Sequence, residues 1–392
     1  MNRMFTRLLA TLLMLTLALA IPFQAMATSS LDQNTEDTDQ SIANNPDLTD
    51  AEKQQWQEWA SEENTDGTAD AADDALVSQL EDATADNTQL DPEDLANLEL
   101  NDALPTNVIN ILLLGVDNRS VDLKSGLSDA VIICSLNTDD GSVKLTSITR
   151  DTEVVIPGYK NKRRINCAFK FGSKDGDLDA GAQLAMKTVN RNFQMNIQRY
   201  VVVNIHGLAS IIDSLGGVDM DMSSKEASRI NFELRKEPMD NVKRAKVEAK
   251  DGVQHLDGMQ AVTYARIRGI DNDFMRSERQ RKLLATLMAQ VMKDVDISKL
   301  VGLIQTALPF GATNLTASDM VSFGGLVIGG SAMSKLQSGE SVLEQFRVPM
   351  DDTWKYDSEN GATMTAFKND KRLRENIEAM QKFIYGESYY KE

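Results

Sequence analysis

The 392-residue chain has only two cysteines, two histidines and eight prolines. Aromatic residues make up 6% of it. Two cysteines exclude a small scaffold held by several disulfides. Cys134 and Cys167 are compatible with one disulfide but are better explained as two buried thiols. The sequence also contains no glycine-rich nucleotide-binding loop, no nucleophile elbow and no paired-histidine zinc motif. Because acidic and basic residues nearly balance after residue 104, no positive excess favours nucleic-acid binding, and we expect no nucleic-acid partner.

The N-terminus has the three parts of a secretory signal. Arg3 and Arg7 precede an apolar run from Leu8 to Phe23, and an Ala-Met-Ala sequence ends at Ala27. We predict that residues 1–27 are a signal peptide cleaved after Ala27, with an uncleaved membrane anchor as the alternative. Both interpretations predict an exported protein that acts outside the cytoplasm.

An acidic segment follows, from residue 28 to residue 104. It holds 22 Asp and Glu residues but only one basic residue, Lys53, and it has few β-branched or aromatic residues. Such a composition buries too little apolar surface to offset the entropy of the chain, which predicts a disordered linker. Two fragments of it could be helical: one after a capping box at Thr49 to Glu52, and one from Asp73 to Ala83. The alternative is a partner-binding segment that uses Trp56 and Trp59.

The remaining residues, 105–392, predict one folded domain of the α/β class. Continuous aliphatic runs at 108–114, 130–136 and 143–148 are typical of strands buried on both faces, and a turn cluster at 137–141 predicts a hairpin between the last two. Helical periodicity appears at 179–193, 208–215, 257–266, 274–295, 297–307, 317–327 and 370–385, with further strands at 200–205 and 346–349. Interleaved strands and helices predict a mixed central sheet covered by helices on both faces.

Polar residues gather where the predicted strands end. Asp117 and Arg119 follow the first strand directly, and Asp129 precedes the second. Ligands of open α/β sheets bind near such ends, and two carboxylates without histidine or thiolate suit Mg²⁺ carrying phosphate oxygens. The alternative is a turn or capping role for each aspartate.

Arginines dominate the other polar clusters. Arg150 and Asp151 end the third strand, and a basic run reaches Arg164. A last cluster joins two helices and contains Arg266, Arg268, Asp271, Asp273, Arg276, Arg279, Gln280 and Arg281. On the second helix Arg276 and Gln280 continue the apolar stripe of Leu284, Leu287, Met288 and Val291, whereas Arg281 and Lys282 point elsewhere. This arrangement predicts an anion site of converging guanidinium groups, with structural ion pairs to Asp271 or Asp273 as the alternative.

Together these segments resemble the LytR-CpsA-Psr family, whose members attach lipid-carried glycopolymers to peptidoglycan in Gram-positive envelopes. The likeness covers residues 107–386. It rests on motifs that include Asn110 to Arg119, Ser128-Asp129, Ser147 to Thr152, Arg164 to Ala168, Leu215 to Asp219, and Leu256 through Arg268 to Gln280. Two positions depart from the family pattern: Leu127 stands where an arginine is common and Thr149 where a proline is common.

The resemblance implies specific roles and partners. Asp117 and Asp129 would hold Mg²⁺, while a polyprenyl pyrophosphate-linked glycan would bind beside a hydrophobic tunnel for its lipid. Leu208, Ile211, Ile212 and the apolar stripe at 284–291 are candidates for the tunnel, with ordinary core packing as the alternative. Asp273 is the candidate general base and Asp151 the second choice. Catalytic roles fall to Arg150, Arg266, Arg268, Asp273 and Arg276, and substrate-binding roles to Arg119, Arg164, Arg279 and Gln280.

The function expected from this resemblance is transfer of a glycosyl-1-phosphate from a polyprenyl pyrophosphate carrier to peptidoglycan, at the outer face of the cytoplasmic membrane or in the wall of a Gram-positive-type bacterium. In-line phosphoryl transfer needs mainly charge neutralisation, which arginines and a metal ion supply. Two alternatives remain open: a non-catalytic envelope protein that binds polyprenyl-phosphate lipids or anionic polymers, and a hydrolase that uses water as the acceptor.

Overall fold

The computed structural model describes most of the predicted domain and two parts of the acidic segment. The described residues are 49–50, 53–59, 91–116, 123–174, 176–236, 242–271, 273–294, 311–338, 343–357 and 364–391. The predicted export segment 1–27, the helix expected at 297–307, and Asp117 and Arg119 lie outside them.

A six-stranded mixed sheet forms the centre of the domain, with the strand order β10-β3-β2-β1-β6-β9. Strand β1 pairs antiparallel with β2 and parallel with β6, while β3 pairs antiparallel with β2 and parallel with β10. The short strand β9 closes the other edge, antiparallel to β6. The strands are β1 (Val108–Val116), β2 (Ser128–Asn137), β3 (Val143–Ile148), β6 (Arg199–Asn204), β9 (Gly311–Thr313) and β10 (Leu343–Val348).

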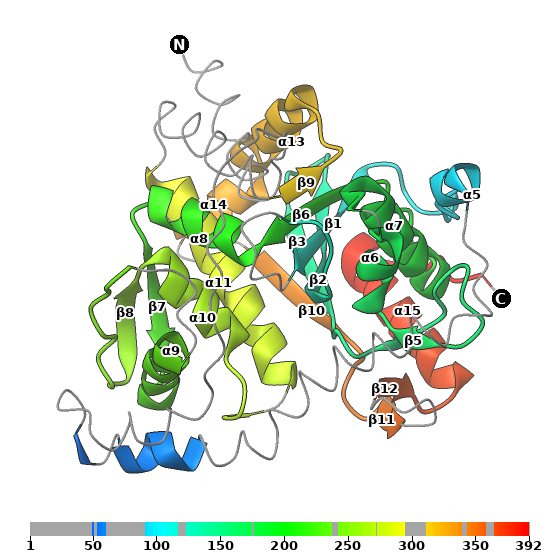
Figure 1. Ribbon diagram of the computed structural model, residues 1–392. Helices are drawn as coiled ribbons and strands as arrows, with labels where there is room; N and C mark the ends of the chain where they lie inside the picture. Colours follow the sequence, from blue (N-terminus) through cyan, green and yellow to red (C-terminus); the bar gives the residue numbers. More distant parts are fainter. Residues whose placement is uncertain are drawn as a thin grey trace.

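Helices cover both faces of this sheet (Figure 1), which confirms the predicted α/β architecture. Because side chains of a strand alternate between faces, Leu112 and Leu114 enter the core under one set of helices, while Leu113 faces the other set. The first set is α6 (Cys167–Gly172), α7 (Leu178–Phe193) and α15 (Asp370–Tyr385). The second is α8 (Ile205–Ser214), α10 (Gly258–Arg266) and α11 (Asp273–Asp294).

Smaller elements surround this framework. A second hydrophobic core joins α8, α10 and α11 to the antiparallel pair β7 (Val218–Met222) and β8 (Gly252–Leu256) and to helix α9 (Ser224–Lys236). Two further strand pairs are β4 (Glu153–Val154) with β5 (Arg163–Arg164), and β11 (Trp354–Asp357) with β12 (Met364–Phe367). The remaining helices with named bounds are α5 (Pro92–Ala96), α13 (Ala317–Gly329) and α14 (Ser331–Ser338).

Most of the predicted elements lie within a few residues of the observed ones, and β3 and α15 match them fully. The hairpin between β2 and β3 is also confirmed. Helix α9 was missed because the segment after Ser224 has few apolar residues. Its buried side is made by Ala227, Ile230, Phe232 and the aliphatic and guanidinium parts of Arg229.

The expectation of a disordered linker over the whole of residues 28–104 is not met in its described parts. Asp91 caps helix α5, and Leu104 is 4% exposed in the main core, against which Leu95 and Leu98 also pack. Further upstream, residues 53–59 are helical, and both of their tryptophans are buried. The folded part of the chain therefore includes acidic residues that composition alone assigned to the linker.

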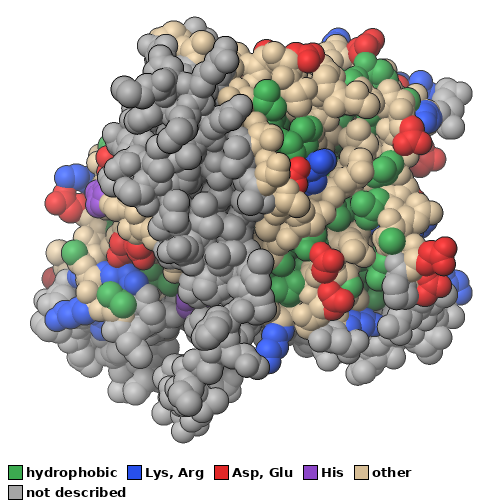
Figure 2. Space-filling view, turned by 90° about the horizontal axis from the view of Figure 1, so that it is seen from above, with side chains coloured by type: hydrophobic (Ala, Val, Ile, Leu, Met, Phe, Trp, Pro, Cys, Tyr) green, Lys and Arg blue, Asp and Glu red, His purple; other side chains and the backbone are tan. Residues whose placement is uncertain are grey.

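Other sequence-based expectations concern the surface and the cysteines. Cys134 and Cys167 are free and buried, as expected for two thiols. On the described part of the face shown in Figure 2, acidic and basic side chains are interspersed, in keeping with the near balance of charge after residue 104. Among the helices of the described residues, none combines the length and apolar character needed to cross a membrane.

Candidate functional site

The candidate site is organised around Asp129, which a β-bulge places at the edge of the sheet. Gly115 pairs with Ala130 and Val116 with Ser128, so Asp129 is an extra residue between two paired positions. Bulges of this kind redirect a side chain away from the regular alternation of a strand. The predicted location of Asp129, beside the end of the first strand, is confirmed.

Two arginines from distant parts of the chain bind the Asp129 carboxylate. Arg150, which follows β3, places Nη1 3.1 Å from Oδ1, and Arg268, which follows α10, places Nη2 3.0 Å from Oδ2. Backbone bonds fix the first of these, since Thr149 donates to the Val348 carbonyl and Asn166 donates to the Arg150 carbonyl. The structure thus joins the sheet edge to the loop after α10, as the predicted anion site requires.

A third arginine, Arg276 on the first turn of α11, is 3% exposed and belongs to the same cluster. Burial alone would raise the pKa of Asp129, but the charges of Arg150, Arg276 and Arg268 outweigh it and hold that pKa well below its ordinary value. Asp129 is therefore an anion at neutral pH, surrounded by three cations.

This depressed pKa gives a pH-dependent contribution to stability. Because the folded-state pKa lies below the ordinary 3.8 of an aspartate, the contribution is fully present above that value and is lost as the pH falls through the folded pKa. We expect the difference in unfolding free energy between wild type and Asp129→Asn to be constant from about pH 5 to 8 and to shrink in acid below about pH 4. Urea denaturation at several pH values measures it, and a difference that does not shrink in acid would contradict this ionisation state.

Asp151 connects Arg150 to a fourth arginine. Its carboxylate oxygens lie 3.5 Å from Arg150 Nε and 3.5 Å from Arg164 Nη1, and all three side chains are at most 15% exposed. Asp151 thus lies between Arg150 and Arg164, where its carboxylate can orient both guanidinium groups. Four arginines share two carboxylates here, and this excess of positive charge suits a multiply charged anion.

An apolar cavity opens between the sheet and the second set of helices. It encloses about 620 Å³, including open solvent at its mouth. Side chains from the two layers line it: Leu113, Ala130, Ile132, Val201 and Val203 with Gly115 from the sheet, and Leu208, Ala265, Leu283, Leu284 and Leu287 from the helices. Leu284 and Leu287 of the predicted α11 stripe and Leu208 therefore line this cavity, whereas Ile211 and Ile212 are buried. The side chains of Met288 and Val291 lie outside the described part of the chain.

Gln280 links the cavity to the arginine cluster. Its side chain lines the cavity, and its Nε2 donates to the backbone carbonyl of Asp129 at 3.4 Å. The helical periodicity that placed Gln280 beside Leu284 and Leu287 is thus confirmed. Arg281 points away, as predicted, and donates to Ser147 and Gln345 under β3 and β10.

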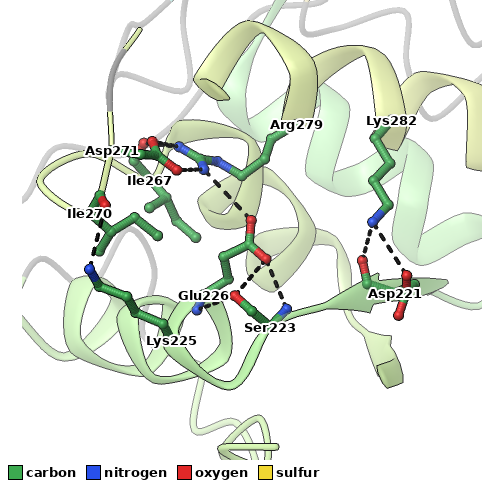
Figure 3. A network of polar contacts seen from close by, with 9 residues as sticks. All are labelled: Asp221, Ser223, Lys225, Glu226, Ile267, Ile270, Asp271, Arg279 and Lys282. Atoms are coloured by element: carbon green, nitrogen blue, oxygen red, sulfur yellow. Dashed lines mark hydrogen bonds and ion pairs between the residues drawn. The ribbon is translucent and has the colours of Figure 1, made fainter. Parts of the chain in front are cut away.

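Arg279, which the sequence analysis assigned to substrate binding, contacts other groups of the protein. Figure 3 shows its guanidinium enclosed by protein groups. It donates to both carboxylate oxygens of Asp271 at 2.5 and 2.9 Å and to the Ile267 carbonyl at 2.9 Å, and it lies 3.6 Å from Glu226. At 3% exposure, Arg279 forms a buried ion pair with Asp271.

The remaining predicted site residues are placed only in part. Arg266 is the last residue of α10, two positions before Arg268. Asp273 begins α11, but its side chain lies outside the described part of the chain, as do Asp117 and Arg119. Within the described residues no group of three His, Cys, Asp or Glu side chains is arranged to hold a metal ion.

Asp129 nevertheless has the donor chemistry that Mg²⁺ requires. Its two carboxylate oxygens offer about four lone-pair sites in total, so the bonds to Arg150 and Arg268 leave acceptor capacity. Mg²⁺ commonly takes one or two carboxylates and completes its coordination with water and substrate phosphates. Asp129 could therefore supply one carboxylate ligand to a site of this open kind.

Sequence reasoning missed the sheet side of the cavity. Leu113, Ala130 and Ile132 were assigned to strands, but alternation alone does not distinguish a packed face from a hollow one. The small residues Gly115 and Ala130 carried a signal, because neighbouring strands with short side chains leave space between the sheet and the helices above it.

A mixed sheet with an arginine-rich anion site next to an apolar cavity defines a class of protein suited to amphiphilic phosphate ligands. Comparison with known proteins narrows this class. The model of the LytR_cpsA_psr family matches residues 74–382, and the chain belongs to this family. The resemblance found in the motifs is thereby confirmed.

Curated relatives include two teichoic acid transferases. The chain is 30% identical over 214 residues to the polyisoprenyl-teichoic acid–peptidoglycan teichoic acid transferase TagV of Bacillus subtilis (strain 168), covering 54% of this chain and 50% of TagV. It is 34% identical over 194 residues to the corresponding transferase TagU of Oceanobacillus iheyensis, covering 49% of this chain and 54% of TagU. The chain thus spans about half the length of these relatives.

Solved structures confirm the fold. The crystal structure of B. subtilis TagV matches with a TM-score of 0.52 and 23% identity, covering 72% of this chain and 98% of that one. A structure described as TagT bound to LI-WTA matches with a TM-score of 0.54 and 21% identity, over 76% and 94% of the two chains.

Proposed function

We propose that this protein transfers a glycopolymer from a polyprenyl pyrophosphate carrier to a hydroxyl group of peptidoglycan, outside the cytoplasm. The observation that carries the proposal is the direct connection, through Gln280, of an arginine cluster to an apolar cavity. A prenyl diphosphate has a multiply anionic diphosphate that matches the arginine cluster and an apolar prenyl chain that matches the cavity. The names of the curated relatives, which are teichoic acid transferases to peptidoglycan, support the same reaction.

The proposed reaction is a phosphoryl transfer. The acceptor oxygen bonds to the phosphorus that carries the glycan, the bond from that phosphorus to the bridging oxygen breaks, and polyprenyl phosphate leaves with the bridging oxygen. The acceptor hydroxyl loses its proton, for which Asp273 is our candidate base. Arg150, Arg268 and Arg276 neutralise charge on the phosphate oxygens, with Arg164 next to Asp151. Arg266, at the end of α10, is a further candidate for the same role.

We also propose that Mg²⁺ is the cofactor and that Asp129 holds it together with Asp117. When bound, the ion would add positive charge next to the phosphates. Asp129 supports this role because it is ionised and lies at the cluster itself. Transfer is expected to fall on chelation of divalent cations and to return when Mg²⁺ is added.

The test uses the purified chain, a polyprenyl pyrophosphate donor labelled in its glycan, and peptidoglycan. Label joined to peptidoglycan, with release of polyprenyl monophosphate, is the expected result. Binding of the donor without turnover would instead indicate a non-catalytic envelope protein, and release of free phosphorylated glycan would indicate a hydrolase.

The proposed lipid site makes a separate prediction for Leu284, which lines the cavity from α11. Leu284→Ser is expected to weaken binding of a polyprenyl phosphate about tenfold or more, because full burial of a leucine side chain contributes about 1.5–3 kcal/mol. A matched control is Leu373→Ser, which changes a partly buried leucine of α15 on the opposite face of the sheet. Equal affinities for wild type and Leu284→Ser would exclude the cavity as the lipid site.

A further inference from the structure

A short part of the acidic segment docks on the folded domain through two tryptophans. We name residues 53–59 the docked segment; it is the blue helix below α9 in Figure 1. Trp56 is 2% exposed and Trp59 is 4% exposed. Both rings pack edge-on against Phe232 of α9, at centroid distances of 5.7 and 5.5 Å. A helix of seven residues is not stable alone in water, so the burial of these two aromatic rings is what stabilises it.

Arginines of α9 complete the docking surface. Arg229 is 1% exposed and pairs with Glu233 at 2.7 Å. Its guanidinium lies 5.1 Å from the ring centroid of Trp59 and 4.7 Å from that of Phe232, while Arg235 lies 5.9 Å from Trp56. A buried guanidinium over aromatic faces is stabilised by desolvated cation–π attraction. The docked segment therefore fixes the position of Arg229.

The other side of the same surface holds the loop between α10 and α11, residues 267–271. Gly269 adopts φ +73°, and a Cβ atom there would lie 3.4 Å from Arg229 Nη2. The Ile270 side chain packs against the cluster of Trp56, Trp59 and Phe232. Lys225 Nζ donates to the Ile270 carbonyl at 3.4 Å, as Figure 3 shows. Thus the Ile270 side chain packs on the cluster that contains both tryptophans, and the Gly269 backbone lies beside Arg229.

Arg268 is the residue of this loop that reaches Asp129, at 3.0 Å, and it stands directly before Gly269. A continuous set of contacts therefore runs from Trp59 through Arg229 to Gly269, and from Trp56 and Trp59 to Ile270. We propose that the docked segment is a positioning element of the site: it holds the 267–271 loop so that the Arg268 guanidinium meets Asp129. The catalytic part of this inference rests on the proposed transfer function, whereas the positioning of the loop does not.

The primary test compares the full chain with the double variant Trp56→Ala/Trp59→Ala. Hydrogen exchange of residues 267–271 is expected to become at least tenfold faster, because the loop loses one side of its packing. The rate of glycopolymer transfer, measured as kcat/KM, is expected to fall about tenfold, because a displaced catalytic group is costly. The matched control is Gln54→Ala/Gln57→Ala, which changes exposed residues of the same helix and should alter neither quantity.

Two further variants separate positioning from general stability. Ile270→Ala removes the contact on the loop side and should reproduce the faster exchange of residues 267–271. Trp59→Phe keeps an aromatic ring and should retain much of the wild-type protection of these residues from exchange. In an Arg268→Ala background, loss of both tryptophans should cause little additional loss of transfer, since the two changes act on one interaction.

Unchanged exchange of residues 267–271 in Trp56→Ala/Trp59→Ala, in a variant whose docked segment itself exchanges much faster than in wild type, would overturn the proposal. So would a full additional loss of transfer in the Arg268→Ala background. If wild type shows no transfer at all, the proposed function fails, but hydrogen exchange still decides whether the docked segment holds the loop.

Discussion

Arg268→Ala is expected to lower the rate of glycopolymer transfer about 100- to 1,000-fold, since removal of one preorganised donor to developing charge costs about 2.7–4 kcal/mol of barrier. Arg268 is suited to this role because it is 32% exposed on its side chain and therefore open to substrate, while its Nη2 is fixed 3.0 Å from Asp129. Stability should change little, because Asp129 keeps its partner Arg150. Steady-state kinetics and thermal unfolding of the same preparations measure both effects.

Arg374→Ala provides the matched control for this experiment. Arg374 pairs with Glu378 on the exposed side of α15, with side chains 45% and 37% exposed, and should change neither transfer nor folding appreciably. Arg268→Lys should recover part of the activity at most, because an ammonium group lacks the fork geometry of a guanidinium. Transfer by Arg268→Ala at the wild-type rate would remove Arg268 from the mechanism.

Arg279→Ala is expected to act on stability, by about 3 kcal/mol of unfolding free energy. Removing one member of a buried ion pair typically costs about 3–5 kcal/mol, and the low end applies because Asp271 and Glu226 are 25% and 18% exposed. The variant also leaves the Ile267 carbonyl without its donor. Urea or thermal denaturation measures the loss.

An exposed pair serves as the comparison for this second variant. Arg372 pairs with Glu375 at 2.6 Å on α15 with a 43% exposed side chain, so Arg372→Ala should cost no more than about 1 kcal/mol. If Arg279→Ala were as stable as Arg372→Ala but bound the diphosphate donor poorly, the original substrate-binding interpretation of Arg279 would be restored.

Local sequence patterns predicted the framework well because its strands are unusually apolar. Strands β1, β2 and β3 are buried on both faces. Their continuous apolar runs therefore predicted them, although they lack the alternating pattern of half-buried strands. Where an element is polar and only half buried, as in α9, the pattern was too weak, and burial of Arg229 could not be anticipated from its composition.

The candidate site was only partly predictable for a different reason. The order of motifs indicated that Asp129, Arg150, Arg268 and Arg276 act together, and the structure brings their charges to one place. Helical periodicity predicts the face of α11 on which Arg279 lies, but it does not predict which groups of the neighbouring loop the side chain contacts. Asp271 and Ile267 accept from the Nη atoms of this arginine because that loop lies against α11.

Trp56 and Trp59 show the limit of composition as a guide. The segment around them is acidic and poor in apolar residues, which favours disorder when the chain is considered alone. Their partners, Phe232 and Arg229, lie on a helix far along the sequence. The capping box at Thr49 to Glu52 indicated the helix, but not the surface on which its two aromatic rings dock, and the structure places them on this chain's own surface.

The most direct test of the whole account is a structure of the full chain with a polyprenyl diphosphate. We expect the diphosphate to contact Arg150, Arg268 and Arg276 beside Asp129, and the prenyl chain to enter the cavity past Gln280 between Leu208 and Leu284. A prenyl chain bound elsewhere, with the cavity empty and the arginine cluster free of phosphate, would contradict it.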